Sequence, residues 1–311
     1  MIGLHMNLKE LYDKKINIMQ YFREKFNTIE NKSDAILTSY DLQAGSYIKQ
    51  LSDNHLYHIN GVPLEMKGCD FLTKFAQYLA KEIKQFEHKS IMEAGVGEAT
   101  TLAYLMQCSD LNDCEFYGFD LAPSRILHGK AFLESRNLQA ELFTGNMLSI
   151  PHQDSAFDIV YTVHAIEPNT NLAESILQEL YRITNQYLIL IEPSFELGNN
   201  ETKANINKHA YIKNLKGTVE KLGYKITKYE LCPLGSYANQ PAIMIIEKKD
   251  GKLSSTDFAC PICHSQKSFS KDNEGYYCDG CFMFFPIVRG VPILTKEAGV
   301  LFTQYKTEIN Y

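Results

Sequence analysis

The feature that most constrains the fold is a regular alternation of apolar and amphipathic segments between residues 90 and 247. The apolar segments have the length of buried strands and cover residues 90–94, 115–119, 140–143, 157–163, 187–191, 225–231 and 242–247. Helical patterns between the first five of them cover residues 100–107, 124–135 and 171–183. Strands that alternate with helices of this length form parallel βαβ units.

The last two expected strands are joined through a short connection that contains residues 232–236 and is too short for a crossover helix. They are therefore expected to form an antiparallel hairpin. The sequence thus predicts an α/β fold with a seven-stranded, mostly parallel Rossmann-like sheet that ends in an antiparallel hairpin. The strand count separates the chain from dinucleotide-binding dehydrogenases.

Two further regions flank this alternation. Apolar residues recur at helical spacing in residues 7–30 and 66–86, with an aromatic-rich segment between them. A polar linker follows the last strand at residues 248–256. We expect three parts, which are an N-terminal helical cap region (1–88), a central domain (89–250) and a small C-terminal domain (256–311).

Length and charge narrow the class of protein. The 311 residues suffice for one large domain and a small satellite. The net charge is −6, and Lys and Arg are not clustered, which disfavours a large nucleic-acid substrate without excluding a local basic patch. The chain has no long apolar run, and its N-terminus becomes charged within ten residues. We therefore expect a cytoplasmic protein that does not associate with a membrane.

A glycine turn follows the first expected strand, in the sequence Glu93-Ala94-Gly95-Val96-Gly97-Glu98-Ala99. Glycine at a strand-to-helix turn permits a tight bend and a close approach of the backbone to a ligand. The helix that begins near residue 100 can bind a polar or carboxylate-bearing ligand at its N-terminus. Dehydrogenases and ordinary turns also contain such glycines, so the turn alone indicates only a nucleotide-like ligand.

Residues after the next three strands make this ligand more specific. Asp120 ends the second strand, about twenty residues beyond the glycine turn, where an acidic side chain can accept both hydroxyls of a ribose. Asn146 and Met147 follow the third strand. Val163 and His164 lie at the end of the fourth.

This ordered set resembles the class I S-adenosylmethionine-dependent methyltransferases over residues 90–247. The resemblance implies methyl transfer from that cofactor. It also implies a set of cofactor-binding residues, which are Glu93, Gly95 and Gly97 at the amino-acid end, Asp120 at the ribose, Asn146 and Met147 at the adenine, and Val163 and His164 under the methionine part. Leu121, next to Asp120, also belongs to this set. The chain departs from the family pattern at Ala99, which replaces a third glycine, and at Asn146, where many members have Asp.

An earlier segment, residues 40–47, is similar to an aromatic stretch that caps the cofactor in some small-molecule methyltransferases. Tyr40 and Tyr47 are therefore candidate cofactor contacts. Simple packing of these aromatic rings is the alternative.

Methyl transfer requires mainly the alignment of the acceptor and, for a hydroxyl, removal of its proton. His164 is the best candidate for this base, since its ordinary pKa is about 6.5. Glu167 is a second candidate catalytic residue, able to orient the acceptor. His164 could instead only shape the cofactor floor, and Glu167 could cap the next helix. His209 and Tyr211 are further candidates for the mouth of the substrate site.

The chain lacks the NPPY-type tetrapeptide after the fourth strand. That element is typical of enzymes that methylate exocyclic amines of bases or glutamine amides, so these substrates are disfavoured.

The C-terminal part contains two CxxC pairs, Cys260 with Cys263 and Cys278 with Cys281. Two such pairs offer one tetrahedral site of four thiolates. Zinc suits this site and iron is the minor alternative. Four thiolates leave no position for a catalytic water, so the zinc is expected to be structural. The four remaining cysteines are scattered and are expected to be reduced.

Residues 257–296 resemble the small zinc-ribbon activator of tRNA, rRNA and release-factor methyltransferases, in the layout CPxC, CxxC and then FPIxxGxPxL. In that family the hydrophobic tail adds a strand to the sheet edge of the methyltransferase, and the resemblance implies the same here. Residues 252–311 hold six basic and six acidic side chains, which argues against capture of phosphates by this part.

The sequence favours a methyltransferase that acts on a hydroxyl or amine of a small molecule such as a metabolite, sugar or lipid precursor. A tRNA, rRNA or protein methyltransferase with a fused activator is the alternative. A non-catalytic cofactor-binding assembly protein is a third possibility. The oligomeric state is left open.

Overall fold

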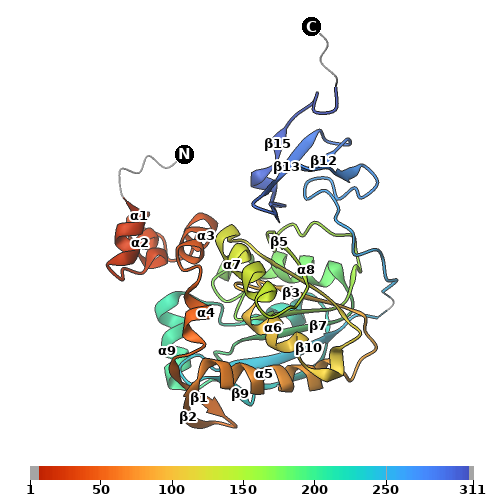
Figure 1. Ribbon diagram of the computed structural model, residues 1–311. Helices are drawn as coiled ribbons and strands as arrows, with labels where there is room; N and C mark the ends of the chain where they lie inside the picture. The colour runs from red at the N-terminus through yellow and green to blue at the C-terminus, as the bar shows by residue number, and fades with distance from the viewer. Residues whose placement is uncertain (1–6, 250, 308–311) are drawn as a thin grey trace.

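The computed structural model describes residues 7–249 and 251–307 (Figure 1). Residues 1–6 of the expected cap region, residue 250 at the end of the central domain and residues 308–311 of the C-terminal part lie outside the described residues. Within the described ranges, no helix has the length and apolar character needed to cross a membrane.

A seven-stranded sheet forms the centre of the molecule. Its strands are β3 (Ser90–Ala94), β4 (Glu115–Asp120), β5 (Glu141–Thr144), β6 (Phe157–Val163), β7 (Thr184–Pro193), β8 (Lys225–Leu231) and β10 (Pro241–Glu247). They are arranged in the order β5–β4–β3–β6–β7–β10–β8. The first five are parallel, and β10 is antiparallel to both β7 and β8. The predicted mixed sheet and its antiparallel hairpin are confirmed.

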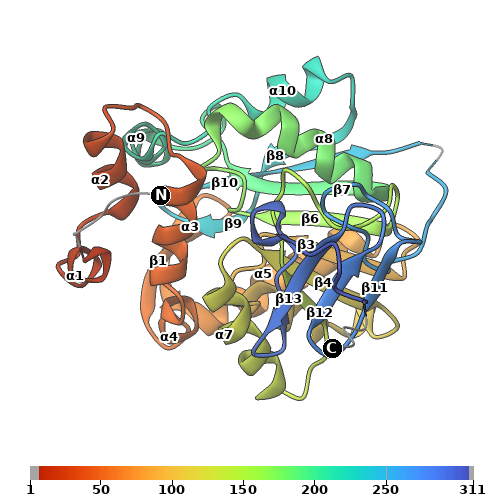
Figure 2. The ribbon, with the colours of Figure 1, turned by 90° about the horizontal axis from the view of Figure 1, so that it is seen from above.

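Helices cover both faces of this sheet. They include α5 (Gly68–Ile83), α6 (Thr100–Met106) and α7 (Pro123–Glu134) on one face, and α8 (Ala173–Ile183) and α10 (Leu215–Lys221) on the other (Figure 2). Alternate residues of each strand point to opposite faces. Ile91 accordingly packs with α5 and α6, whereas its neighbour Met92 packs with α8. Both side chains are fully buried.

The N-terminal region differs from the single long helix predicted for residues 7–30. It forms two helices, α1 (Leu8–Asp13) and α2 (Ile18–Lys25). Lys15 between them has a φ of 60°, and the side chain of Asn17 accepts a hydrogen bond from the N–H of Gln20 at 2.9 Å. The left-handed residue and the capping side chain start a new helix that periodicity alone does not reveal.

The aromatic-rich segment also contains more structure than the sequence indicated. It forms α3 (Ser33–Leu42), α4 (Ser46–Gln50) and an antiparallel pair, β1 (Asn54–Ile59) and β2 (Val62–Lys67). A short strand, β9 (Leu234–Ser236), lies within the connection between β8 and β10 and pairs with β1. The cap region is therefore joined to the central domain through a second, three-stranded sheet.

The remaining helices are α9 (Asn200–His209), which lies with α10 in the connection from β7 to β8, and three short 3-10 helices at Ser109–Leu111, Thr170–Leu172 and Lys296–Ala298. Figures 1 and 2 both place α9 beside the N-terminal helices. The guanidinium of Arg23 donates hydrogen bonds to the carbonyls of His209 and Lys208 at 3.2 and 3.3 Å. These contacts hold α2 against the end of α9.

The C-terminal part is a small antiparallel sheet above β5 (Figure 1). Its strands are β11 (Phe269–Lys271), β12 (Gly275–Cys278), β13 (Met283–Val288), β14 (Val291–Pro292) and β15 (Val300–Leu301). The chain after β14 runs parallel to β5, with Ile293 opposite Thr144. The N–H of Leu294 donates to the carbonyl of Thr144 at 2.8 Å. This segment therefore pairs with the edge of the central sheet at one bridge, whereas the sequence resemblance implied an added strand.

Candidate active site

A cavity of about 420 Å³ lies at the carboxyl ends of the parallel strands, the edge at which open α/β sheets bind ligands. Every residue that the sequence indicated for the cofactor or for catalysis lines this cavity. These residues are Tyr40, Tyr47, Glu93, Gly95, Gly97, Asp120, Leu121, Asn146, Met147, Val163, His164 and Glu167. The structure thus brings together side chains from the N-terminal region and from the ends of four strands.

The glycine turn has a backbone that other residues rarely adopt. Gly95 has a φ of 79° and Gly97 a φ of 54°. A Cβ atom on Gly95 would lie 2.4 Å from the Cβ of Ala165, which is far inside contact distance. Glycine is therefore required at position 95 both by conformation and by space.

Asp120 fixes this turn to the start of α7. Its Oδ2 accepts a hydrogen bond from the N–H of Gly97 at 3.0 Å, and its Oδ1 accepts one from the N–H of Ala122 at 2.8 Å. Burial raises the pKa of the carboxyl group, although both hydrogen bonds oppose this rise. The turn with its carboxylate, beside the side chains of Leu121 and Met147, fits the ribose and adenine of S-adenosylmethionine.

Glu93 lies at the end of β3 and is almost fully buried. The hydroxyl of Tyr161 donates to its Oε2 at 2.7 Å. Burial raises the pKa of Glu93 to about 8. A cationic ligand group, such as the amino group of the cofactor, would favour the ionised form of this carboxyl.

Glu98 connects the glycine turn to the cap region, a role that the sequence did not suggest. Its carboxylate accepts hydrogen bonds from the N–H groups of Gly45 at 2.9 Å, Tyr47 at 3.3 Å and Ile48 at 2.9 Å. Glu98 therefore satisfies the free N–H groups at the start of α4. No local sequence pattern could show this, because the partners are about fifty residues away in the chain.

Arg125, in the first turn of α7, was also missed. It is 4% exposed and lines the cavity. Its guanidinium carbon lies 4.7 Å from the ring centre of Tyr40 and 4.4 Å from that of Tyr47. The expected aromatic stretch thus contacts an arginine beside the cofactor turn. The only indication in the sequence that Arg125 could line the cavity is its position, five residues after Asp120.

At the other end of the cavity, His164 forms a polar group with Glu167 and Asn239. The Nδ1 of His164 lies 3.3 Å from the Oε2 of Glu167. The side-chain amide of Asn239 donates to the same carboxylate oxygen at 3.3 Å and lies 3.3 Å from Nδ1. Burial lowers the pKa of His164, but the hydrogen bond and charge of Glu167 outweigh it, so the pKa lies above its ordinary value.

These contacts bear on the alternative that Glu167 caps a helix. Leu172 is the N-cap residue of α8 and makes no side-chain capping hydrogen bond. Glu167 instead contacts His164 and Asn239. Asn239 was not among the residues indicated by the sequence, because it lies in the loop between β9 and β10.

Glu192, at the end of β7, holds the turn that follows His164. Its two carboxylate oxygens accept hydrogen bonds from the N–H groups of Ala165 at 3.0 Å and Ile166 at 3.2 Å. His164 itself has a φ of 52°, in the left-handed region. Burial and the nearby charge of Glu167 raise the pKa of Glu192 to about 7.

His209 and Tyr211, which were expected near the mouth of the site, do not line the cavity formed by the described residues. The carbonyl of His209 instead accepts a hydrogen bond from the amide of Asn31 at 3.2 Å. Burial raises the pKa of the Tyr211 phenol, and the charge of Glu167 raises it further.

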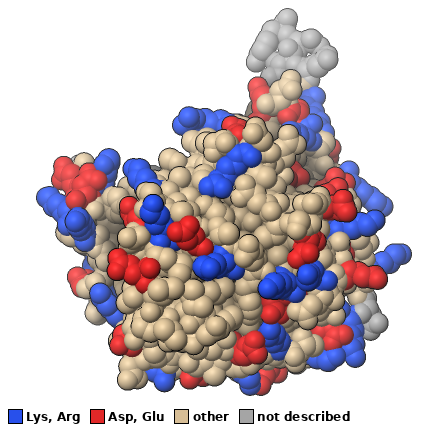
Figure 3. Space-filling view, turned by 60° about the horizontal axis from the view of Figure 1, so that its bottom comes forward, with Lys and Arg blue, Asp and Glu red and all other residues tan. Residues whose placement is uncertain are grey.

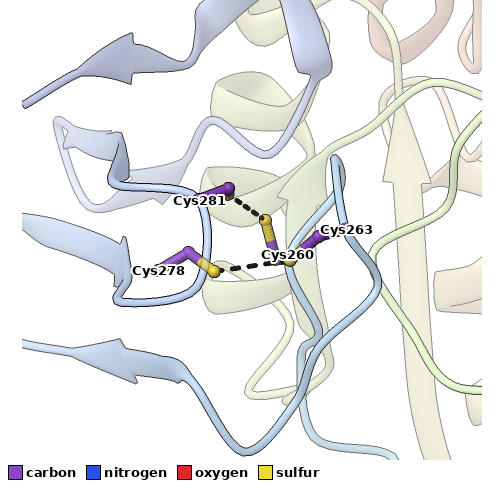
Figure 4. Close-up of side chains that lie close together, drawn as sticks. All are labelled: Cys260, Cys263, Cys278 and Cys281. Carbon is purple, nitrogen blue, oxygen red and sulfur yellow. Dashed lines mark hydrogen bonds between the residues drawn. The ribbon is translucent and has the colours of Figure 1, made fainter.

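The four cysteines of the C-terminal part converge from two facing loops (Figure 4). Their sulfur atoms all lie within 4.8 Å of one another. The Sγ atoms of Cys260 and Cys281 are 3.6 Å apart, and those of Cys263 and Cys278 are 3.5 Å apart. Thiolates bound tetrahedrally to zinc at about 2.3 Å would lie about 3.8 Å from one another. The arrangement therefore fits a tetrahedral metal site and is too wide for disulfides, whose sulfur atoms are about 2 Å apart.

Comparison with known proteins agrees with this fold. Residues 91–186 match the family model described as a methyltransferase domain. The protein is an S-adenosylmethionine-dependent methyltransferase with a class I domain. A stretch of 38 residues is also 40% identical to a UPF0434 protein from Blochmanniella pennsylvanica (strain BPEN), and it covers 12% of this chain and 69% of that protein. Through this stretch the chain belongs to the UPF0434 family.

The solved structure of the [4+2]-cyclase SpnF shows the same fold at low sequence identity, and two further structures have a more distant likeness. The structure of the [4+2]-cyclase SpnF is 14% identical, with a TM-score of 0.54 over 70% of this chain and 97% of that one. Magnesium protoporphyrin IX methyltransferase from Synechocystis PCC 6803 is 10% identical, with a TM-score of 0.46 over 78% of this chain and 100% of that one. A sarcosine dimethylglycine methyltransferase assigned in Galdieria sulphuraria is 11% identical, with a TM-score of 0.47 over 57% and 86% of the two chains.

Proposed function

We propose that this enzyme transfers the methyl group of S-adenosylmethionine to a hydroxyl or amine of a small molecule. The observation that carries the proposal is a single cavity that contains the glycine turn and Asp120 at one end and His164 with Glu167 at the other. Ser33, Ile36 and Tyr40 of the N-terminal region also line this cavity. Such a wall suits an acceptor of metabolite size, for example a sugar or a lipid precursor.

The charge of the molecule supports a small acceptor over a nucleic acid. The chain carries a net charge of −6. On the face shown in Figure 3, side chains of both signs are interspersed without an extended positive area. Binding of a polyphosphate substrate depends on such an area.

The residues of the cavity divide the work of the reaction. Bound S-adenosylmethionine supplies a methyl group on a positively charged sulfur. In this proposal Glu93 and the glycine turn hold the amino-acid end of the cofactor, Asp120 and Leu121 hold the ribose, and Asn146 and Met147 flank the adenine. Val163 would contact the methionine part. The end of the cavity that contains His164 and Glu167 would then receive the acceptor.

His164 then removes the proton of the acceptor. The carboxylate of Glu167 lies 3.3 Å from Nδ1 and stabilises the imidazolium that forms. Asn239 contacts both groups and orients them. Since the pKa of His164 lies above its ordinary value, kcat/KM should rise with pH until the imidazole is neutral.

The cysteine cluster would hold a structural zinc ion. All four ligands are thiolates, which leaves no position for a reacting water. The ion would fix the two loops from which the small sheet is built. That sheet packs on β5 and on the hydrophobic core of the central domain.

A second function rests on the same C-terminal part. The resemblance of residues 257–296 to the zinc-ribbon activator, together with the bridge between Ile293 and Thr144 of β5, supports a fused activator and hence a tRNA, rRNA or protein substrate. The mixed charge of the C-terminal part speaks against RNA capture by this part itself.

Transfer of a radioactive methyl group distinguishes these functions. The enzyme is incubated with methyl-labelled S-adenosylmethionine and a cell extract separated into low-molecular-mass, RNA and protein fractions. Label in the low-molecular-mass fraction is the expected result, and it should disappear with Asp120→Ala. Asp110→Ala, at an exposed ion pair with Lys84, is the matched control. Label confined to the RNA or protein fraction would overturn the proposal.

The role of His164 is tested once a labelled acceptor is known. His164→Ala should lower kcat by about 100-fold or more and remove the acidic limb of the pH profile. Glu167→Gln should move that limb to lower pH, because it removes the carboxylate that raises the pKa of His164. Full turnover of His164→Ala with an unchanged pH profile would refute the role as base.

A further inference from the structure

Arg125 is a buried cation, and no carboxylate among the described residues is in direct contact with it. The side chain lies at the wall of the cavity, and the residue is 4% exposed. Within residues 7–249 and 251–307, it forms no ion pair with a carboxylate. Burial lowers the pKa of the guanidinium, but Tyr47, which also hydrogen-bonds to it, and the charge of Asp120 outweigh this effect, so the group stays charged. The nearest acidic groups include Asp120, whose two oxygens already accept hydrogen bonds from backbone N–H groups. Burying a charge in this way is costly unless a partner is supplied.

The surrounding residues hold the guanidinium in one orientation. Its Nε donates to the carbonyl of Tyr40 at 3.0 Å, and one terminal nitrogen lies 3.5 Å from the Oε1 of Gln43. The rings of Tyr40 and Tyr47 lie 4.7 and 4.4 Å from the guanidinium carbon. The other terminal nitrogen is directed at the glycine turn, because a Cβ on Gly97 would lie 3.2 Å from it. These contacts preorganise the group before any ligand binds.

We propose that Arg125 binds the carboxylate of the methionine part of S-adenosylmethionine. The cofactor carries one carboxylate, and the glycine turn beside Arg125 belongs to the cofactor end of the cavity. An arginine and a carboxylate form strong, directional hydrogen bonds, particularly where water is excluded. This assignment rests on the cofactor site of the proposed function, and it adds a residue outside the glycine turn to that site.

Two other roles for Arg125 predict different behaviour. If the side chain only fastens Tyr40 and Tyr47 to α7, its loss would weaken every ligand of the cavity equally. If it binds a carboxylate of the acceptor, its loss would raise the KM of the acceptor and leave cofactor affinity unchanged. Only the proposed role couples Arg125 to the carboxylate of the cofactor.

The experiment compares two cofactors that differ in this carboxylate alone. Binding of S-adenosylmethionine and of decarboxylated S-adenosylmethionine is measured by calorimetry for the wild type and for Arg125→Gln. The substitution should weaken S-adenosylmethionine by about 10- to 100-fold and the decarboxylated form by less than about threefold. The ratio of these two changes isolates the interaction between side chain and carboxylate.

Arg136→Gln is the matched control. Arg136 also lies over two aromatic rings, those of Tyr104 and Phe132, at 4.7 and 4.5 Å, but it does not line the cavity. Arg136→Gln should leave the affinities for S-adenosylmethionine and for its decarboxylated form unchanged. Equal weakening of the two cofactors by Arg125→Gln, or no weakening of either, would overturn the proposal.

The wild type provides a measurement that does not depend on folding of a variant. It should bind S-adenosylmethionine about 10- to 100-fold more tightly than the decarboxylated form, and equal affinities would overturn the proposal. Failure of the wild type to bind either form would instead contradict the cofactor site itself. The two failures are therefore distinguishable.

Discussion

The junction between the C-terminal sheet and the central sheet offers a direct test of how the two parts depend on each other. Leu294 is fully buried at this junction, and its N–H donates to the carbonyl of Thr144 on β5 at 2.8 Å. Its side chain belongs to one hydrophobic cluster that contains Phe285 of the C-terminal sheet and Phe143 of the central sheet. Leu294→Ala removes side-chain packing from this cluster and leaves the backbone hydrogen bond in place.

The expected loss follows from the burial of the side chain. A leucine-to-alanine change in a closed core costs about 3 kcal/mol, because both the transfer free energy and the contacts around the new cavity are lost. The entropy of unfolding is about 2.1 cal/mol/K per residue, so a chain of 311 residues has about 0.65 kcal/mol/K. A loss of 3 kcal/mol therefore lowers Tm by about 5 °C.

Calorimetry and urea denaturation measure this effect on the full chain. Leu301→Ala is the control, because Leu301 lies in β15 of the same small sheet but is 67% exposed. It should cost less than about 0.5 kcal/mol. Since the two sheets share one core, the Leu294→Ala shift should appear in the transition that S-adenosylmethionine stabilises. The reasoning is refuted if that transition stays in place while only a separate transition of the small sheet moves.

Three further outcomes follow from the buried groups. Removal of zinc from a zinc-loaded sample by a strong chelator should lower Tm before it lowers cofactor affinity, and an unchanged Tm would contradict a structural metal. Burial, helped by the charge of Arg182, lowers the pKa of His152 to about 3. The imidazole of His152 therefore stays neutral in the native state, whereas it gains a proton in the unfolded state below about pH 6.5. The free energy of unfolding consequently falls as the pH falls, by about 2 kcal/mol at pH 5. His152→Phe should flatten this dependence in urea titrations, and an equally steep dependence would refute the assignment. Glu192→Gln removes a charge that raises the pKa of His164, so the acidic limb of kcat/KM should move to lower pH, and an unmoved limb would show that Glu192 does not act on the histidine.

The central fold could be predicted from the sequence because its signals are local. Each strand from 90 to 247 is a short apolar run, and each buried helix face recurs at the helical period. The N-terminal region could not be predicted in the same way. The break between α1 and α2 depends on one left-handed residue, and β1 pairs with β9, a strand about 180 positions later in the chain.

The same distinction applies to the candidate site. Gly95, Gly97 and Asp120, which line the cavity, could be predicted as site residues because their spacing along the chain follows from one strand–helix–strand unit. Asn239 was not found, because it reaches His164 from a loop 75 residues away. Contacts of that kind depend on how loops meet at the strand ends and leave no periodic pattern.

The backbone at His164 and its acid–base behaviour share one physical origin. Glu192 accepts the N–H groups of Ala165 and Ile166 and so fixes the turn in which His164 has a left-handed conformation. The charge of the same carboxylate contributes to the raised pKa of the imidazole. Ala165, held in this way, occupies the space in which Gly95 would carry a Cβ. A side chain at position 95 would therefore displace the turn that positions the histidine as well as the cofactor. Glycine at position 95 is thus required by the turn that carries His164 as well as by its own backbone conformation, and the contact with Ala165 links the two ends of the cavity.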